Sequence, residues 1–121
     1  HLDTFGHMNH ATYLQVFEEA RWEIIDNHGF DVKTIQTKRI GPTILKVEID
    51  YKRELLNRQW IKIVTRPTPM KKKIGFIYQQ MTNEKDEVCS DIKITYGLFD
   101  LNKRKLIEPP LEWLDALNLP H

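Results

Sequence analysis

The chain has 121 residues, of which 40% are hydrophobic and 29% are charged, with a formal net charge of +1. This composition predicts one soluble globular domain over residues 1–121, because no run approaches the ~20 apolar residues of a membrane span. The small net charge argues against a nucleic-acid or membrane partner. The one cysteine, Cys89, cannot form an intrachain disulfide, and no signal peptide is recognisable, so we expect a cytoplasmic protein.

The segment from Thr12 to His28 predicts a long amphipathic helix. Its apolar residues recur at spacings of three and four, so they form one stripe that should face a core. Asn9 or Thr12 is expected to cap its start, and Gly29 stands where a left-handed terminating residue belongs. The predicted stripe contains Leu14, Phe17, Ala20, Ile24 and Ile25, and is widened by Tyr13 and Trp22.

The second half of the chain reads as strands. After a short, partly helical connection over residues 31–37, apolar and polar residues alternate from Leu45 to Lys52, as in a half-buried strand. The tail from Pro109 predicts a short helix or a surface segment. One helix followed by sequential strands predicts an α+β fold with an antiparallel sheet packed on the helix. Three more strands are expected to begin near Trp60, Ile74 and Ser90.

Such a sheet has two exposed edges. Natural proteins commonly cover an exposed edge by pairing it with a second subunit. We therefore expect a homo-oligomer.

The stretch HLDTFGHMNHATYLQVFEEAR, from His1 to Arg21, places polar groups directly ahead of the predicted helix. Unpaired backbone amides at a helix start form a preorganised site for a developing oxyanion. The carboxylate of Asp3 is a candidate nucleophile or general base beside it.

This stretch resembles the Asp-x-x-Gly-His-x-Asn-x-x-x-Tyr-Leu, then Phe-Glu-x-Ala-Arg, signature of the hotdog-fold acyl-CoA thioesterases, the 4-hydroxybenzoyl-CoA thioesterase-like group. The match runs without a gap from Asp3 to Arg21. The strand VEIDYKRELL also looks like that family's strand after the helix. Two features depart from the family: only His1 and Leu2 remain of its first strand, and the turn after IDYKRE lacks its common Pro-Ala and Leu-Gly-Asp residues.

The resemblance implies a hotdog fold, in which an antiparallel sheet wraps around a long central α-helix. It implies a homodimer or homotetramer with active sites between subunits, and Asp3 as the catalytic carboxylate. It implies no bound cofactor, because coenzyme A is part of the substrate. The expected substrate-positioning and oxyanion region comprises Gly6, His7, Asn9, His10, Ala11, Thr12 and Tyr13.

Several of these residues have more than one reading. His7 and His10 are three residues apart, but no further ligand follows at a metal-binding spacing, so we expect no metal site. His7 is instead expected to be structural, and His10 to orient the substrate or cap the helix. Glu18 is either a buried polar anchor that pairs with Arg21 or an active-site partner across the dimer. Lys71, Lys72 and Lys73 form a solvated turn or contact the phosphates of coenzyme A.

The sequence argues against a serine or a cysteine as the nucleophile. Ser90 is the only serine and has no Gly-x-Ser-x-Gly motif around it, and Cys89 lies in a strand pattern typical of a buried cysteine. The favoured hypothesis is hydrolysis of a fatty or aromatic acyl-CoA. A thiol with a pKa of roughly 8 to 9 leaves unassisted, so one carboxylate and the helix-start amides can suffice for this reaction. The alternatives are a module that binds acyl-CoA or acyl carrier protein thioesters without hydrolysis, and a thioesterase that acts on acyl carrier protein.

Overall fold

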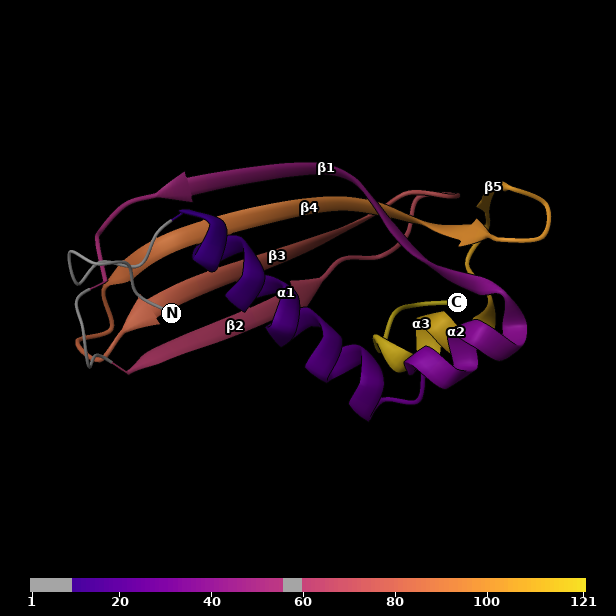
Figure 1. The fold of residues 1–121 in the computed structure, drawn as a ribbon, viewed down its shortest axis with the longest axis horizontal. Helices are drawn as coiled ribbons and strands as arrows, with labels where there is room; N and C mark the ends of the chain where they lie inside the picture. The colour runs from indigo at the N-terminus through magenta and orange to yellow at the C-terminus, as the bar shows by residue number, and fades with distance from the viewer. Residues whose placement is uncertain (1–9, 56–59) are drawn as a thin grey trace.

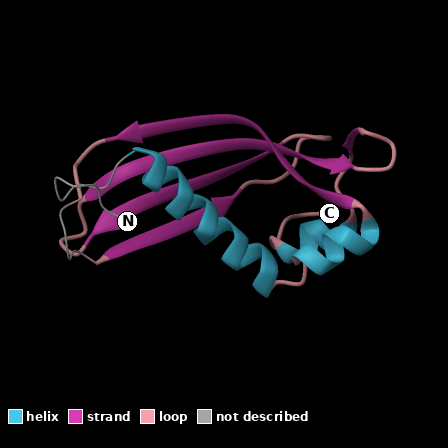
Figure 2. Ribbon diagram, in the orientation of Figure 1, coloured by secondary structure: helices cyan, strands magenta, loops and turns pink. Residues whose placement is uncertain are grey.

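A computed structural model describes residues 10–55 and 60–121 of the chain. Figures 1 and 2 show an antiparallel sheet crossed on one face by one long helix, with two short helices gathered beyond the end of that helix. The elements are α1 (His10–Asn27), α2 (Val32–Lys38), β1 (Ile40–Tyr51), β2 (Ile61–Pro67), β3 (Gly75–Asn83), β4 (Val88–Asp100), β5 (Lys105–Ile107) and α3 (Leu111–Ala116).

Helix α1 confirms the prediction of a long N-terminal helix, although it begins two residues earlier, at His10. Thr12 therefore lies in the first turn and is not the cap, while Asn9 lies outside the described residues. Gly29 has a φ of 98°, the left-handed conformation expected at the helix end. The next residue, Phe30, donates its backbone N–H to the Ile25 carbonyl at 3.1 Å and is fully buried, which fixes the exit from α1.

The four long strands follow the order β1-β4-β3-β2, every pair is antiparallel, and β5 adds to the end of β4. This topology confirms the predicted α+β architecture. Within the described sheet, β1 and β2 are the edge strands. The first helix crosses the sheet obliquely, from the end of β1 to the far side of β2 (Figure 1).

Strand β1 begins at Ile40, five residues before the predicted Leu45, and contains an irregularity that the sequence pattern did not reveal. The register with β4 shifts between Ile44 and Lys46, so Leu45 is the extra residue of a bulge. Beyond the bulge, Val47 lies opposite Ile94 on the face that carries α1. Val47 remains 44% exposed and Leu45 46% exposed.

The core lies between α1 and the inner faces of β3 and β4. Phe17, Met81 and Leu98 are fully buried there. The prediction that Leu14 is a core residue is wrong: its side chain is 39% exposed, because it lies on the flank of α1 that faces the open β1 edge. None of the helices in residues 10–55 and 60–121 is long and apolar enough to cross a membrane.

The C-terminal tail was predicted to be a short helix or a surface segment, and it forms the short helix α3. Pro110 occupies the N-cap position, and the helix buries Trp113 completely. The indole ring of Trp113 meets Phe30 edge-on, with 5.2 Å between ring centroids. The helix α3 therefore closes the end of the core that lies beyond α1.

Candidate functional site

The described residues contain only part of the predicted site. His10 and Ala11 begin α1, and Thr12 and Tyr13 complete its first turn, so the predicted oxyanion region does include a helix start. The remaining predicted residues of this region lie outside the described residues: Asp3, Gly6, His7 and Asn9.

Tyr13 fixes the start of α1 beside the end of β1. Its ring is 3% exposed and meets Tyr51 edge-on, with 5.1 Å between centroids. Its hydroxyl donates a hydrogen bond to the Arg53 carbonyl at 3.3 Å. Burial raises the pKa of Tyr13, so the hydroxyl stays a neutral donor. Tyr13 is therefore a residue that positions the helix start.

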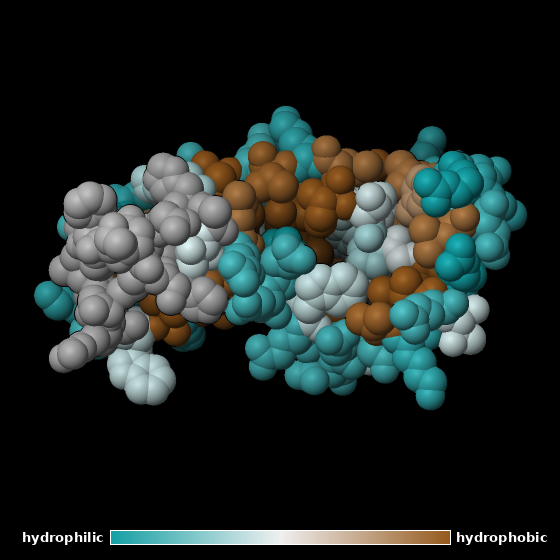
Figure 3. All heavy atoms as spheres, viewed as in Figure 1, coloured by the Kyte–Doolittle hydropathy of each residue, from teal (hydrophilic) through white to brown (hydrophobic). Residues whose placement is uncertain are grey.

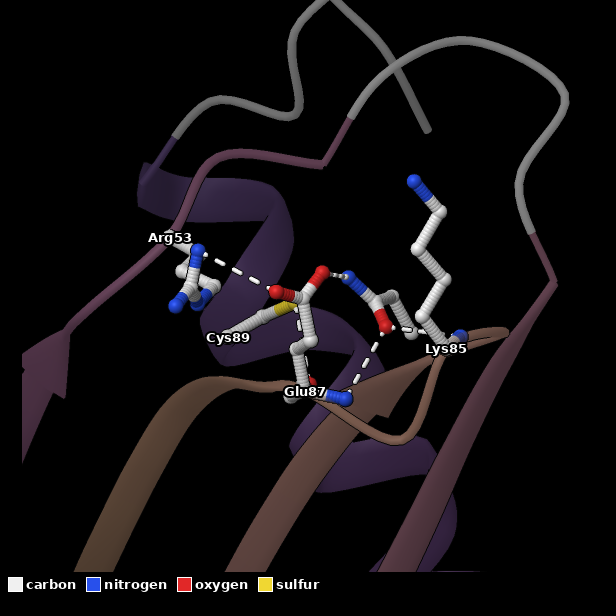
Figure 4. A network of polar contacts seen from close by, with 5 residues as sticks. Arg53, Lys85, Glu87 and Cys89 are labelled. Atoms are coloured by element: carbon white, nitrogen blue, oxygen red, sulfur yellow. Dashed lines mark hydrogen bonds and ion pairs between the residues drawn. The ribbon is translucent and has the colours of Figure 1, made fainter.

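A polar network at the β3–β4 turn holds the chain after β1 in the same region (Figure 4). The side-chain oxygen of Asn83 accepts the backbone N–H groups of Lys85 and Glu87, at 2.9 and 3.0 Å, and its amide donates to the Glu87 carboxylate at 3.0 Å. Glu87 also forms an ion pair with Arg53 at 3.2 Å. The hydrogen bond from Asn83 and the charge of Arg53 lower the pKa of Glu87, which keeps the pair ionised.

The network lies beside the first turns of α1 in Figure 4, so it braces the segment after β1 against the helix start. The backbone supports the same arrangement, because the Lys52 N–H donates to the Cys89 carbonyl at 2.8 Å. Sequence reasoning missed this network. The polar turn TNEKDE contained the signal, since an Asn ahead of a turn commonly accepts the following backbone N–H groups.

A second polar cluster lies under the middle of α1. Gln79 is 3% exposed, and its amide donates to the Phe17 carbonyl and to the Thr65 hydroxyl, both at 3.0 Å. Its side-chain oxygen accepts a hydrogen bond from Arg21 at 2.9 Å. Burial lowers the pKa of Arg21, partly offset by the charge of Glu18. The strand period of two places Gln79 on the inner face of β3, so the sequence contained this signal.

Glu18 is exposed on α1, so the hypothesis of a buried polar anchor is wrong. The nearby Arg21 makes its hydrogen bond to Gln79 instead. The role of Glu18 across a subunit interface stays a prediction.

The three lysines of the basic turn do not lie near the helix start of their own chain. Lys71, Lys72 and Lys73 are exposed in the β2–β3 connection, where Lys72 has a left-handed φ of 57°. This connection and the β3–β4 turn are at opposite ends of β3, and the helix start lies at the β3–β4 end (Figure 1). Contact with a substrate at that helix start would require these lysines to come from another subunit.

A cavity of about 260 Å³ lies between the second half of α1, β1 and α3. Figure 3 shows hydrophobic atoms in the hollow between α1 and β1. The wall is fixed by hydrogen bonds: Trp113 donates to the Tyr96 hydroxyl at 3.0 Å, which donates to the Met70 sulfur at 3.3 Å. We call this space the distal cavity; it is lined by Glu18, Arg21, Trp22, Ile25, Pro42, Ile44, Ile77, Tyr96 and Trp113.

The two alternative nucleophiles occupy structural positions. Cys89 is fully buried, and burial raises the pKa of its thiol. Ser90 is also fully buried, and its hydroxyl donates to the Asp50 carbonyl at 2.8 Å. Their surroundings support the exclusion of a serine or cysteine nucleophile. Among the described residues, no group of three or more His, Cys, Asp and Glu side chains could hold a metal ion.

A family model described as the thioesterase-like superfamily matches residues 1–117. The chain belongs to this superfamily. Membership confirms the thioester-hydrolase class and, with the sheet and helix described above, the hotdog fold.

Individual proteins show the same likeness. The long-chain acyl-CoA thioesterase FadM of Escherichia coli strain K12 is 29% identical over 108 residues, covering 88% of this chain and 81% of FadM. The crystal structure of YbaW from Escherichia coli has a TM-score of 0.83 and 28% identity, covering 97% of this chain and 88% of YbaW. The Staphylococcus aureus protein SAV2348, solved in complex with CoA, shares the fold with a TM-score of 0.89 and 17% identity, covering 99% and 79% of the two chains.

The buried hydroxyl of Tyr96 gives the fold a predictable pH dependence. Burial raises the pKa of Tyr96 to about 12, against a smaller opposite effect of the Trp113 hydrogen bond. Below pH ~10, both folded and unfolded chains keep this proton. Between pH ~10 and ~12 only the unfolded chain loses this proton, so the group lowers the free energy of unfolding by roughly 1.4 kcal/mol per pH unit as pH rises.

Urea unfolding from pH 9 to 11.5 tests this dependence. The free energy of unfolding should fall less steeply with pH for Tyr96→Phe than for the parent protein. Equal slopes would contradict the assignment.

Proposed function

We propose that this chain hydrolyses long-chain acyl-CoA thioesters, with Asp3 as the catalytic carboxylate. The observation that carries the proposal is the start of α1, held by Tyr13 beside the end of β1 and preceded in sequence by the family's aspartate motif. Backbone amides at this helix start would stabilise the oxyanion by about 2.7 to 4 kcal/mol for each donor. The reaction consumes water and releases a carboxylic acid and the thiol of coenzyme A.

Asp3 acts in one of two ways. As a general base it would take a proton from the attacking water while the helix-start amides hold the carbonyl oxygen. As a nucleophile it would form a mixed anhydride and expel the thiolate, and water would then release the acid and regenerate the carboxylate. Both routes leave Asp3 unchanged after each turnover, and neither uses a metal.

The choice of a long acyl chain on coenzyme A rests on the relatives. FadM is named a long-chain acyl-CoA thioesterase, and the YbgC proteins of Escherichia coli are named acyl-CoA thioester hydrolases. The SAV2348 structure contains CoA. An acyl carrier protein as the thioester carrier, and a module that binds without hydrolysis, are the competing functions.

We also propose that the protein works as a homo-oligomer joined through the β1 edge. Ile44, Leu45 and Val47 on this edge are 44–47% exposed, and an unpaired apolar edge is a template for a second strand. A two-fold axis beside β1 would pair β1 of each copy antiparallel. The sheet of the second copy would then run in the opposite direction. The basic turn of Lys71, Lys72 and Lys73 in a second copy would then lie at the same end as this chain's helix start, where it could meet coenzyme A phosphates.

Removal of the Asp3 carboxylate should abolish catalysis without loss of binding. For Asp3→Asn and Asp3→Ala, we expect kcat for thiol release from palmitoyl-CoA to fall at least about a hundredfold, as for loss of a general base or nucleophile. Substrate binding, measured by calorimetry with a non-hydrolysable thioether analogue, should change little. Asp115→Asn, in the exposed end of α3, is the matched control. Parental rates in both Asp3 variants would contradict the assignment.

The mass of the protein in solution tests the β1 interface. Sedimentation equilibrium should give two or four times the chain mass of 14.4 kDa. Leu45→Glu should shift the protein toward monomer, because it places a charge on the apolar edge. Val64→Glu on β2, where Val64 is 51% exposed, should leave the mass unchanged. A parent protein that stays monomeric at micromolar concentration would overturn the proposal.

A further inference from the structure

The distal cavity has no role in the chemistry at the helix start. Its lining is mostly apolar, and the wall opposite α1 contains Pro42 and Ile44 of β1, while Ile77 comes from β3. Two charged residues, Glu18 and Arg21, belong to the lining on the α1 side. A volume of about 260 Å³ is just below the usual range of small-molecule sites.

An apolar strip connects this cavity with the helix start. On α1, Leu14 lies four and eleven residues before Glu18 and Ile25, so all three are on one flank of the helix. On β1, Val47 and Tyr51 face the same space, since Val47 pairs with buried Ile94 and Tyr51 contacts Tyr13. Leu14, Val47 and Tyr51 are each 39–44% exposed, and we call them the apolar strip.

The length of α1 gives the distance from the helix start to the distal cavity. From His10 at the helix start, Glu18 is eight residues away and Ile25 fifteen, so the cavity lies about 12 to 22 Å along the helix. An extended chain advances about 1.2 Å per bond, because three backbone bonds span ~3.6 Å. A chain that starts at the helix start would therefore enter the cavity after about ten bonds and reach its end after about eighteen.

The volume leaves room for part of an acyl chain. About 260 Å³ is many times the roughly 10 to 15 Å³ that one water-sized probe requires. A short acyl group would not reach the cavity, and a longer one would meet the wall built from Trp113 and Tyr96.

We propose that the distal cavity binds the far half of a long, unbranched acyl chain, and that Trp113 of α3 sets the maximum chain length. This inference rests on the proposed function, because it takes the thioester to lie at the helix start. The wall suits this role: Trp113 and Tyr96 are 0% and 1% exposed and are hydrogen-bonded to each other, so they cannot retreat from a longer chain without breaking that bond. A second copy of the chain is the competing occupant.

Binding of acyl-thioether analogues of coenzyme A, with 4 to 20 carbons, tests the proposal without catalysis. Each methylene that enters an apolar site strengthens binding about fourfold, the equivalent of about 0.8 kcal/mol. We expect affinity, measured by calorimetry, to rise with chain length through about 16 to 18 carbons and then to level off or fall. An affinity that is independent of chain length beyond about ten carbons would overturn the proposal.

Filling the cavity should shorten the preferred chain. In Ile44→Trp the larger ring occupies the cavity from the β1 side, and Ile44 is 47% exposed, so the core is not overpacked. We expect the 16-carbon analogue to bind at least about tenfold more weakly, the loss of two or more buried methylenes, while the 6-carbon analogue changes less than about twofold. The matched control is Val64→Trp, a 51% exposed position on β2 outside this cavity, which should change neither.

A cavity-enlarging variant keeps the test decisive if Ile44→Trp fails to fold. Trp22→Ala removes a half-buried ring from the lining and should extend the optimum to longer chains. Equal effects on short and long analogues, or an Ile44→Trp effect that appears only as a changed oligomeric mass, would mean that a second copy occupies the space. Failure of hydrolysis with a retained chain-length profile would refute only the proposed function.

Discussion

The architecture depends on the burial of one face of α1 against the centre of the sheet. Phe17 and Ile25 enter the core, and a fully buried side chain of this kind contributes about 1.5 to 3 kcal/mol. The helix crosses the sheet obliquely (Figure 1). On β3, Met81 is fully buried, whereas Val47 on β1 remains 44% exposed. The uncovered part of β1 provides both the exposed edge and the apolar strip that leads to the distal cavity. The same packing therefore leaves uncovered both the edge at which we propose a second subunit and the strip along which we propose that the acyl chain lies.

Two polar clusters make this packing specific. Gln79 satisfies the Phe17 carbonyl and Arg21 from a position that is almost entirely buried, and an amide without partners there would cost about 1 to 3 kcal/mol. This requirement fixes the helix along its axis. At the helix start, Asn83 and Glu87 hold the Arg53 segment, and Tyr13 donates to the Arg53 carbonyl. The start of α1 is thus placed by two other parts of the chain, the segment after β1 and the β3–β4 turn that holds this segment.

Much of the fold could be predicted from local patterns. The spacing of three and four identified α1, and Gly29 identified its end, because both depend on neighbouring residues alone. The exposure of Leu14 could not be predicted, since it depends on where the helix crosses the sheet. The bulge at Leu45 could not be predicted either, since it depends on the register between β1 and β4. The burial of Trp113 likewise depends on Phe30 and Tyr96, which are distant in sequence. Of the candidate site, the structure describes the helix start from His10 to Tyr13. Its role in catalysis and the role of Asp3 stay predictions from the motif.

The most direct test of this account is the number of turnovers in thiol release from palmitoyl-CoA by the parent protein, with substrate in at least a hundredfold molar excess over chains. A catalytic helix start predicts continuous release of many thiol equivalents per chain, with free palmitic acid formed in equal amount. Tight binding of palmitoyl-CoA with no release, or release that stops at one equivalent, would contradict the account and identify the chain as an acyl-binding module.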